Sequence, residues 1–266
     1  MHIELAGRRA LVTGSTSGMG YAIAKGLAEA GADVALHGRS LEGVKVAMER
    51  LSGELDAHVS GYAAELSDPA AVAALTDALP TVDILVSNTG PTPSEPFLEM
   101  NQAQWQRYCD TYISAAATLG RHYIGHMIGH GWGRAIFGAG VTCSYTPGDR
   151  EVANQMTAWL TCKTAMLGLA RGLAEIAAGT GVTVNSVIPG PSFTERDYSA
   201  RPDRPDISFG EFSDEFFNGP GMSSLLHRFI DPAEVANLVI FLASPQASAI
   251  TGEAVRVDGG IIRSAA

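Results

Sequence analysis

The chain has 266 residues, of which 46% are hydrophobic and 17% charged, and this balance fits one large compact domain better than two small ones. Its 28 acidic and 18 basic residues give a formal net charge of −10, which repels a phosphate-rich polymer, so we expect no nucleic acid partner. No apolar run approaches the roughly 20 residues that a membrane span needs, and residues 1–10 lack a secretory pattern, so we expect no membrane partner and a cytoplasmic protein.

The three cysteines are consistent with that location. Cys109, Cys143 and Cys162 are odd in number, far apart, and without the close pairing of a zinc site. A reduced compartment fits them best, with the thiols acting as small apolar side chains. We therefore predict no metal site.

Short apolar runs of strand character recur along the chain, at residues 9–13, 34–37, 59–63, 83–87, 134–137, 182–187 and 254–257. Between them lie stretches rich in alanine and leucine, the first with Ile23, Leu27 and Ala30 at helical spacing before a terminating Gly31. Apolar strands that alternate with helices predict an α/β protein, in which a mainly parallel sheet carries helices on both faces. Because no linker or repeat divides the sequence, we expect a single domain over residues 1–266.

The one irregular region is residues 192–230, which is rich in proline, acidic residues and phenylalanine. A stretch of this length inside a compact domain is typical of a functional lid. We expect Phe209, Phe212, Phe216 and Phe217 to supply apolar walls for a substrate. The alternative is a surface excursion with no such role.

A glycine-rich turn follows the first strand and consists of Gly14, Ser15, Thr16, Ser17, Gly18, Met19 and Gly20. Glycine lets the backbone approach a pyrophosphate, and the start of the following helix offers unpaired N–H groups. Strand, turn and helix in this order predict a nucleotide site.

At this turn the chain resembles the short-chain dehydrogenase/reductase family, whose fingerprint is Thr-Gly, three residues and Gly-x-Gly, here TGSTSGMG at 13–20. The resemblance runs nearly end to end, through SNTG at 87–90, PGPSFT at 189–194, DPAEVA at 231–236 and VDGG at 257–260. It implies a Rossmann-type, doubly wound sheet of seven mainly parallel strands. It also implies a homodimer or homotetramer, formed through the central helices and the C-terminal strand.

The resemblance further implies a nicotinamide cofactor, bound by the glycine-rich turn and by Arg39, Ser40, Glu65, Leu66, Asn88, Thr89, Gly90, Lys163, Pro189, Gly190 and Thr194. The second strand ends without the carboxylate that would bond a ribose 2′-hydroxyl. Arg39 stands there instead, and a guanidinium suits a 2′-phosphate. We therefore expect NADP rather than NAD.

Family members usually reduce a carbonyl or oxidise an alcohol with an asparagine, a serine, and a tyrosine four residues before a lysine. Lys163 is present, but Trp159 stands at the tyrosine position. An indole N–H donates a hydrogen bond and does not release its proton near neutral pH, so the acid/base function is lost at this position. The alternative for Trp159 is a purely packing role.

The serine and asparagine positions are changed as well. By alignment the serine falls on Gly140 and the asparagine on Tyr112, which is either a core aromatic or a phenol in the emptied site. The loop from 140 to 159 is longer than usual, so Thr142, Ser144 or Thr146 could refill the serine's place.

We favour an NADP-dependent oxidoreductase that acts on a small or medium hydrophobic substrate, with Tyr145 as the replacement proton donor. The candidate catalytic residues are Lys163, Tyr145, Tyr112 and Trp159. A non-redox enzyme, such as a cyclase, dehydratase or isomerase, and a non-catalytic binding subunit are the alternatives. The nucleotide motifs favour the first function, whereas the altered acid/base positions favour the second.

Overall fold

The computed structural model describes residues 2–89, 95–140, 150–192, 207–218 and 224–263. Seven strands form one sheet: β1 (Arg9–Val12), β2 (Asp33–Gly38), β3 (Val59–Ala63), β4 (Ile84–Ser87), β5 (Gly133–Gly138), β6 (Val182–Pro189) and β7 (Ala254–Val257). Their order is β3-β2-β1-β4-β5-β6-β7, and every neighbouring pair is parallel. The predicted Rossmann-type, doubly wound single domain is confirmed.

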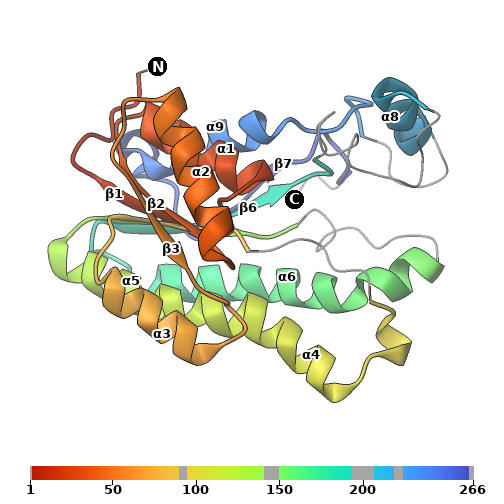
Figure 1. Ribbon diagram of the computed structural model, residues 1–266, viewed down its shortest axis with the longest axis horizontal. Coiled ribbons are helices and arrows are strands. Elements are labelled where there is room, and N and C mark those ends of the chain that lie inside the picture. Colours follow the sequence, from red (N-terminus) through yellow and green to blue (C-terminus); the bar gives the residue numbers. More distant parts are fainter. Residues whose placement is uncertain (1, 90–94, 141–149, 193–206, 219–223, 264–266) are drawn as a thin grey trace.

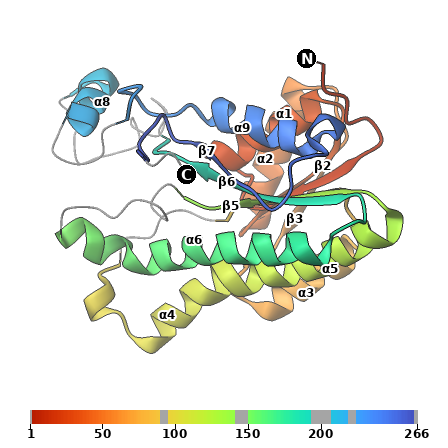
Figure 2. The same ribbon diagram turned by 180° about the vertical axis from the view of Figure 1, so that it is seen from behind.

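Helices cover both faces of the sheet (Figures 1 and 2). One face carries α1 (Gly18–Glu29), α2 (Leu41–Glu54) and α9 (Pro232–Ala243), and the other carries α3 (Pro69–Ala78), α5 (Ala115–His130) and α6 (Arg150–Ile176). A separate hydrophobic cluster fills each interface between sheet and helices. The five inner strands are therefore buried on both sides, which explains their apolar runs, whereas the edge strands β3 and β7 are only partly buried.

The ends of the helices follow from local sequence. Asp68 caps α3 by accepting the N–H of Ala70, with Pro69 in the first turn. Asp231 and Glu234 form a capping box at the start of α9. After α1, Gly31 adopts a φ of 93°, a left-handed conformation that glycine tolerates, so the predicted stop is confirmed.

Two predicted irregular stretches contain helix. Within the loop expected from 140 to 159, α6 begins at Arg150, because residues 150–156 contain neither glycine nor proline to interrupt a helix. Within residues 192–230, α8 spans Phe209–Asn218 and stands apart from the sheet (Figure 1). Its first turn is held by Ser208, whose N–H and hydroxyl both donate to the Glu211 carboxylate.

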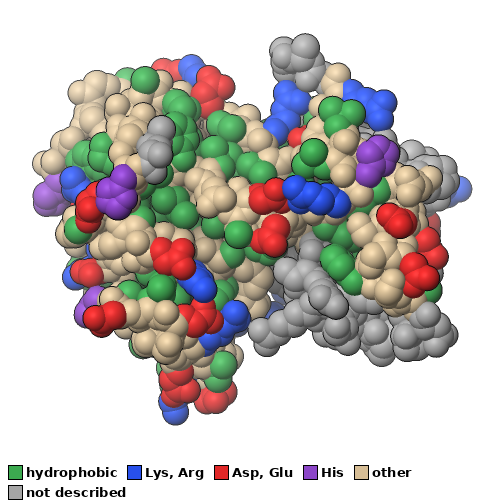
Figure 3. Space-filling view, turned by 90° about the horizontal axis from the view of Figure 1, so that it is seen from above, with side chains coloured by type: hydrophobic (Ala, Val, Ile, Leu, Met, Phe, Trp, Pro, Cys, Tyr) green, Lys and Arg blue, Asp and Glu red, His purple; other side chains and the backbone are tan. Residues whose placement is uncertain are grey.

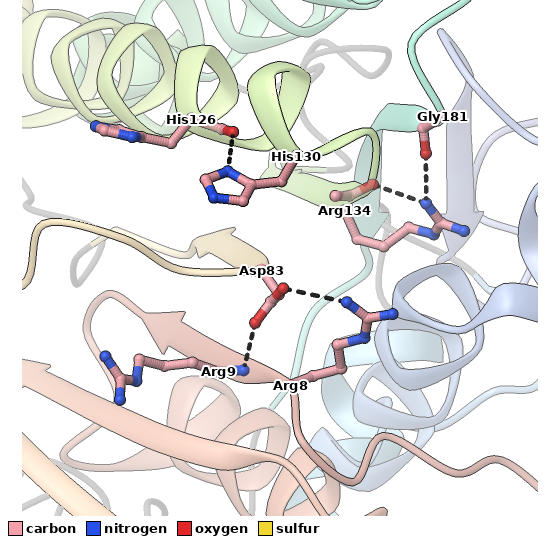
Figure 4. A network of polar contacts seen from close by, with 8 residues as sticks. Arg8, Arg9, Asp83, His126, His130, Arg134 and Gly181 are labelled. Carbon is pink, nitrogen blue, oxygen red and sulfur yellow. Dashed lines mark hydrogen bonds and ion pairs between the residues drawn. The ribbon is translucent and has the colours of Figure 1, made fainter.

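The amino ends of β1 and β4 are joined by polar contacts (Figure 4). The Asp83 carboxylate accepts hydrogen bonds from Arg8 Nη1 at 3.2 Å and from the Arg9 N–H at 2.9 Å. The guanidinium of Arg8 also lies 3.7 Å from the ring centroid of Trp132. These contacts close the edge of the sheet opposite the predicted nucleotide site.

Arg134 in β5 is a buried cation at the same edge, only 2% exposed. Its guanidinium donates to the backbone carbonyls of Gly133, Gly181 and Ser244, at 2.7, 3.1 and 3.2 Å. Carbonyl oxygens thus replace water around the charge, while burial and nearby Arg8 lower the pKa of Arg134.

No helix in the described parts of the chain is long and apolar enough to cross a membrane. On the face seen in Figure 3, acidic and basic side chains are interspersed rather than gathered into one basic surface. The expectations about nucleic acid, membrane and cytoplasm stay predictions.

Candidate active site

The predicted nucleotide turn lies at the carboxyl end of β1, where the strand order reverses between β1 and β4. In open α/β sheets this crevice is where ligands bind. Gly14 and Gly18 adopt φ values of 63° and 55°, which only glycine takes up without strain. A Cβ on Gly20 would collide with the carbonyl oxygen of Gly14, so the backbone passes too close here for any other residue.

The start of α1 is left open to a ligand. Ser17 is the N-cap residue, yet its side chain makes no capping hydrogen bond, and no acidic residue occupies the first turn. Uncapped N–H groups with the positive end of the helix dipole favour an anion. The turn therefore fits the pyrophosphate of a dinucleotide, with Thr16, Gly18 and Met19 partly or fully exposed along it.

His37, at the end of β2, supports this turn from the protein interior. It is 2% exposed, accepts the Gly14 N–H on Nδ1 at 3.2 Å, and has Nε2 3.1 Å from the Ala64 carbonyl. Because a carbonyl only accepts, Nε2 carries the proton and the imidazole is neutral. Burial lowers the pKa of His37, which favours this neutral form.

Ser15 is used inside the turn. Its side chain is fully buried, and its Oγ donates to the Val12 carbonyl at 2.7 Å and accepts the His37 N–H at 2.9 Å. The Ser15 N–H also donates to the His37 carbonyl at 2.9 Å, so both the side chain and the N–H of Ser15 are used within the protein. The glycine-rich motif points to Ser15 but not to His37, because a lone histidine at a strand end has no recognisable pattern.

Asn88 connects the turn to the end of β4. Its N–H donates to Thr13 Oγ1 at 2.9 Å, and its Nδ2 donates to the Thr13 carbonyl at 3.4 Å. The two strand ends at the switch point are thereby fixed to one another, and the cofactor role of Asn88 stays a prediction.

The other predicted cofactor residues of the amino-terminal half lie around the same sheet edge. Arg39 is exposed after β2, and Ser40 caps α2 by accepting the Gly43 N–H at 3.2 Å. Glu65 is exposed and accepts from Ser67, whereas the side chain of Leu66 is buried in the core. A contact between Leu66 and an adenine would therefore use its backbone.

Lys163, on α6, connects two strand ends. It is 6% exposed, and its Nζ donates to the Gly138 carbonyl at 3.0 Å and to the Thr89 carbonyl at 3.3 Å. Gly138 is the last residue of β5, and Thr89 follows β4. The ammonium also lies 5.3 Å from the ring centroid of Tyr112, within the range of a cation–π interaction.

Tyr112 belongs to a π-helical segment, Cys109–Ser114, that joins α4 (Gln102–Tyr108) to α5. Such segments often occur at functional sites, because the extra residue re-aims a side chain. Tyr112 is 3% exposed, and burial strongly raises the pKa of its phenol. Tyr112 is thus a buried aromatic whose ring faces Lys163, and a role for its phenol in the site stays a prediction.

Trp159 lies one helical turn before Lys163 and packs against a buried cluster formed by Tyr108, Tyr112, Ala158 and Cys162. Among the described residues, no group accepts a hydrogen bond from its buried Nε1. The same cluster raises the pKa of the Cys162 thiol to about 12, chiefly through burial, so this thiol is inert.

A phenylalanine cluster connects α8 to the sheet. Phe217 is 1% exposed and its ring centroid lies 4.9 Å from that of Phe229. Phe209 and Phe212 stack on Phe229 at 5.9 and 5.4 Å. The cluster contacts Ile188, Leu167 and Ala139 near the carboxyl ends of β5 and β6, next to the predicted site.

Some predicted positions are buried and others lie outside the described residues. Gly140 is buried, and a Cβ on Gly190 would come within 2.9 Å of the Asp258 backbone. Pro189 ends β6 beside it. Gly90, Thr142, Ser144, Tyr145, Thr146 and Thr194 lie outside the described residues.

Comparisons with known proteins agree with this geometry. Residues 14–262 match the family model described as Enoyl-(Acyl carrier protein) reductase. The uncharacterized oxidoreductase YvrD of Bacillus subtilis (strain 168) is 37% identical over 270 residues, covering 99% of this chain and 100% of that protein. The 3-oxoacyl-[acyl-carrier-protein] reductase FabG of Aquifex aeolicus (strain VF5) is 33% identical over 265 residues, covering 98% and 100%.

Among solved structures, L-sorbose reductase from Gluconobacter frateurii, complexed with NADPH and L-sorbose, is similar with a TM-score of 0.85 at 26% identity. The similarity covers 99% of this chain and 100% of that one. The fold and site therefore define a nucleotide-dependent enzyme of the Rossmann type. The chain belongs to the short-chain dehydrogenase/reductase family and is an NAD(P)-dependent oxidoreductase of that type.

Proposed function

We propose that this oxidoreductase uses NADP and reduces a carbonyl group with a proton donor that is not at the family's usual tyrosine position. The observation that carries the proposal is Trp159, a donor-only indole one turn before Lys163. NADPH, when bound, supplies the hydride. The protein's own residues then have to bind it, hold the carbonyl, and deliver a proton.

The preference for NADP depends on Arg39. It is exposed at the end of β2, where no carboxylate competes with a 2′-phosphate, and its guanidinium can bond two phosphate oxygens. The NADPH in the similar L-sorbose reductase supports the same choice. Calorimetric titration should give tighter binding of NADPH than of NADH. Arg39→Ala should reduce the difference in binding free energy between the two cofactors by about 1–3 kcal/mol. Equal affinities in the parent protein would exclude this preference.

The remaining candidate for the proton donor is Tyr145, which lies outside the described residues but in the segment that leads into α6. We place Lys163 at the cofactor, because its ammonium lies between the ends of β4 and β5, where it donates to the Thr89 and Gly138 carbonyls. The phenylalanine cluster of α8 would present apolar walls to a small or medium hydrophobic substrate.

Steady-state NADPH oxidation over a panel of ketones and enones tests this assignment, with the parent, Trp159→Tyr, Tyr145→Phe and Lys163→Ala. We expect activity that Tyr145→Phe abolishes and that Trp159→Tyr does not raise, because removing one member of an acid/base set costs about 10²–10⁴ in rate. Ketone reduction that survives Tyr145→Phe would place the donor elsewhere. If no compound supports NADPH oxidation although NADPH still binds, a non-redox reaction on the same scaffold is favoured.

We also propose that the protein forms a homodimer or homotetramer. The outer face of α6 supports this, because Gly168 and Gly172 leave open space there and Ile176 is 68% exposed. Light scattering after size exclusion measures the mass, and a monomer at micromolar concentration would contradict the proposal.

A further inference from the structure

Three buried polar atoms near Trp159 lack hydrogen-bond partners within the described part of the chain: Trp159 Nε1, Tyr108 Oη and Glu95 Oε2. A buried polar group without a partner is costly, and native proteins contain few of them. Three such atoms in one neighbourhood indicate that a hydrogen-bonding group outside the described residues meets them.

The three side chains are connected through the buried cluster around Tyr108. Trp159 packs against the buried cluster that contains Tyr108, which is 3% exposed. Arg107, the residue before Tyr108, donates to Glu95 Oε1 at 2.7 Å and so fixes the carboxylate with its other oxygen buried. The carboxylate is close enough to Tyr108 that burial and the Glu95 charge together raise the pKa of the phenol.

The hydrogen-bonding capacity of these atoms defines a ligand. The indole N–H only donates, the carboxylate only accepts, and the phenol can do either. A matching molecule therefore carries one oxygen that accepts and one hydroxyl that donates. Because Trp159 lies one turn from Lys163, that molecule would extend into the reaction site.

We propose that Glu95, Tyr108 and Trp159 are specificity-determining residues that bind a hydroxylated carbonyl compound. The inference rests on the proposed function for its reaction, and it adds that the substrate has a hydroxyl beside the carbonyl. The hydroxyl donates to Glu95, and an oxygen of the substrate accepts from Tyr108 and Trp159. The remainder of the molecule is free to contact the phenylalanine cluster.

Three matched probes test the proposal: 1-hydroxybutan-2-one, its methyl ether 1-methoxybutan-2-one, and butan-2-one. With NADPH present, we expect kcat/KM for the hydroxyketone to exceed that for butan-2-one at least tenfold, the scale of one well-placed hydrogen bond. The ether accepts but cannot donate, so it should lose most of this advantage. Tyr108→Phe and Trp159→Phe should each lower kcat/KM for the hydroxyketone, because each removes one donor to the substrate oxygen.

Stability supplies a readout that does not depend on activity. Tyr108→Phe removes a hydroxyl without a partner, so the unfolding midpoint of the ligand-free protein should stay or rise. Tyr123→Phe is the matched control, because that buried hydroxyl donates to the Leu79 carbonyl at 2.8 Å and its loss should lower the midpoint. Equal losses in the two variants would mean that a structural water serves Tyr108, which overturns the proposal.

Calorimetric titration with butane-1,2-diol and butan-2-ol separates this inference from the proposed function. Tighter binding of the diol, weakened by Tyr108→Phe, supports the site even if no ketone is reduced, in which case only the proposed reaction fails. Equal binding of both alcohols, or equal kcat/KM for hydroxyketone and ketone, rejects the site while leaving the reductase proposal intact.

Discussion

Replacement of His37 by phenylalanine should destabilise the protein and disturb the nucleotide turn. Phenylalanine fills a similar volume, so the main loss is two hydrogen bonds, to the Gly14 N–H and the Ala64 carbonyl. A buried group left without a partner costs about 1–3 kcal/mol, so two groups, one of them only half-buried, cost about 2–4 kcal/mol. Urea unfolding measures this loss.

The parent protein should also lose stability in acid through His37. Because burial lowers the pKa of the folded imidazole, the unfolded chain takes up its proton first, near pH 6.5. The stabilisation that neutral His37 provides is complete above about pH 6.5. It declines as the pH falls below that value, by up to about 1.4 kcal/mol per pH unit. Protonation would also place an N–H on Nδ1, opposite the Gly14 N–H.

Unfolding free energies between about pH 5 and pH 6.5 distinguish this effect from that of other titrating groups, because His37→Phe removes only one of them. The slope against pH should be shallower in the variant than in the parent. Identical slopes would show that His37 is not the neutral, buried base described above. NADPH affinity should fall in parallel, since the turn loses its support.

Three further outcomes are expected. Gly20→Ala should lower NADPH affinity at least tenfold and cost about 1–3 kcal/mol, whereas Gly53→Ala, with open space around it, should be neutral or slightly stabilising. Lys163→Met should lower the free energy of unfolding by about 1–3 kcal/mol even without cofactor, because two carbonyls lose their donor. The control Lys45→Met, at a side chain that is 66% exposed, should change the stability little. Phe217→Ala should lower the local stability of α8 by about 3–5 kcal/mol, which faster hydrogen exchange over α8 would report. Unchanged exchange there would show that α8 does not depend on this side chain.

The architecture was predictable because its determinants are local. Apolar runs gave the strands to within two residues of their ends, and Gly31 marked the end of α1. The relation between Trp159 and Lys163 followed from their spacing on one helix. The helix from Arg150 was also visible in principle, since no breaker interrupts residues 150–156.

The interior of the site was not predictable, because it depends on distant residues meeting. His37 supports Gly14 only after β1 and β2 pair. Tyr108 Oη and Glu95 Oε2 are buried by other elements and have no partner among the described residues, and no sequence pattern reports this. The π-helical turn around Tyr112 likewise has no sequence signature that we recognised.

The bonds of Lys163 have a consequence for how motifs in such sequences are interpreted. Its ammonium is held by backbone oxygens after β4 and at the end of β5, and every sequence supplies those oxygens. The lysine therefore has a role in folding that does not depend on which residue stands at position 159. A lysine at this place is therefore not by itself evidence for a particular proton donor, and a motif search that scores it as such would not distinguish one active-site chemistry from another.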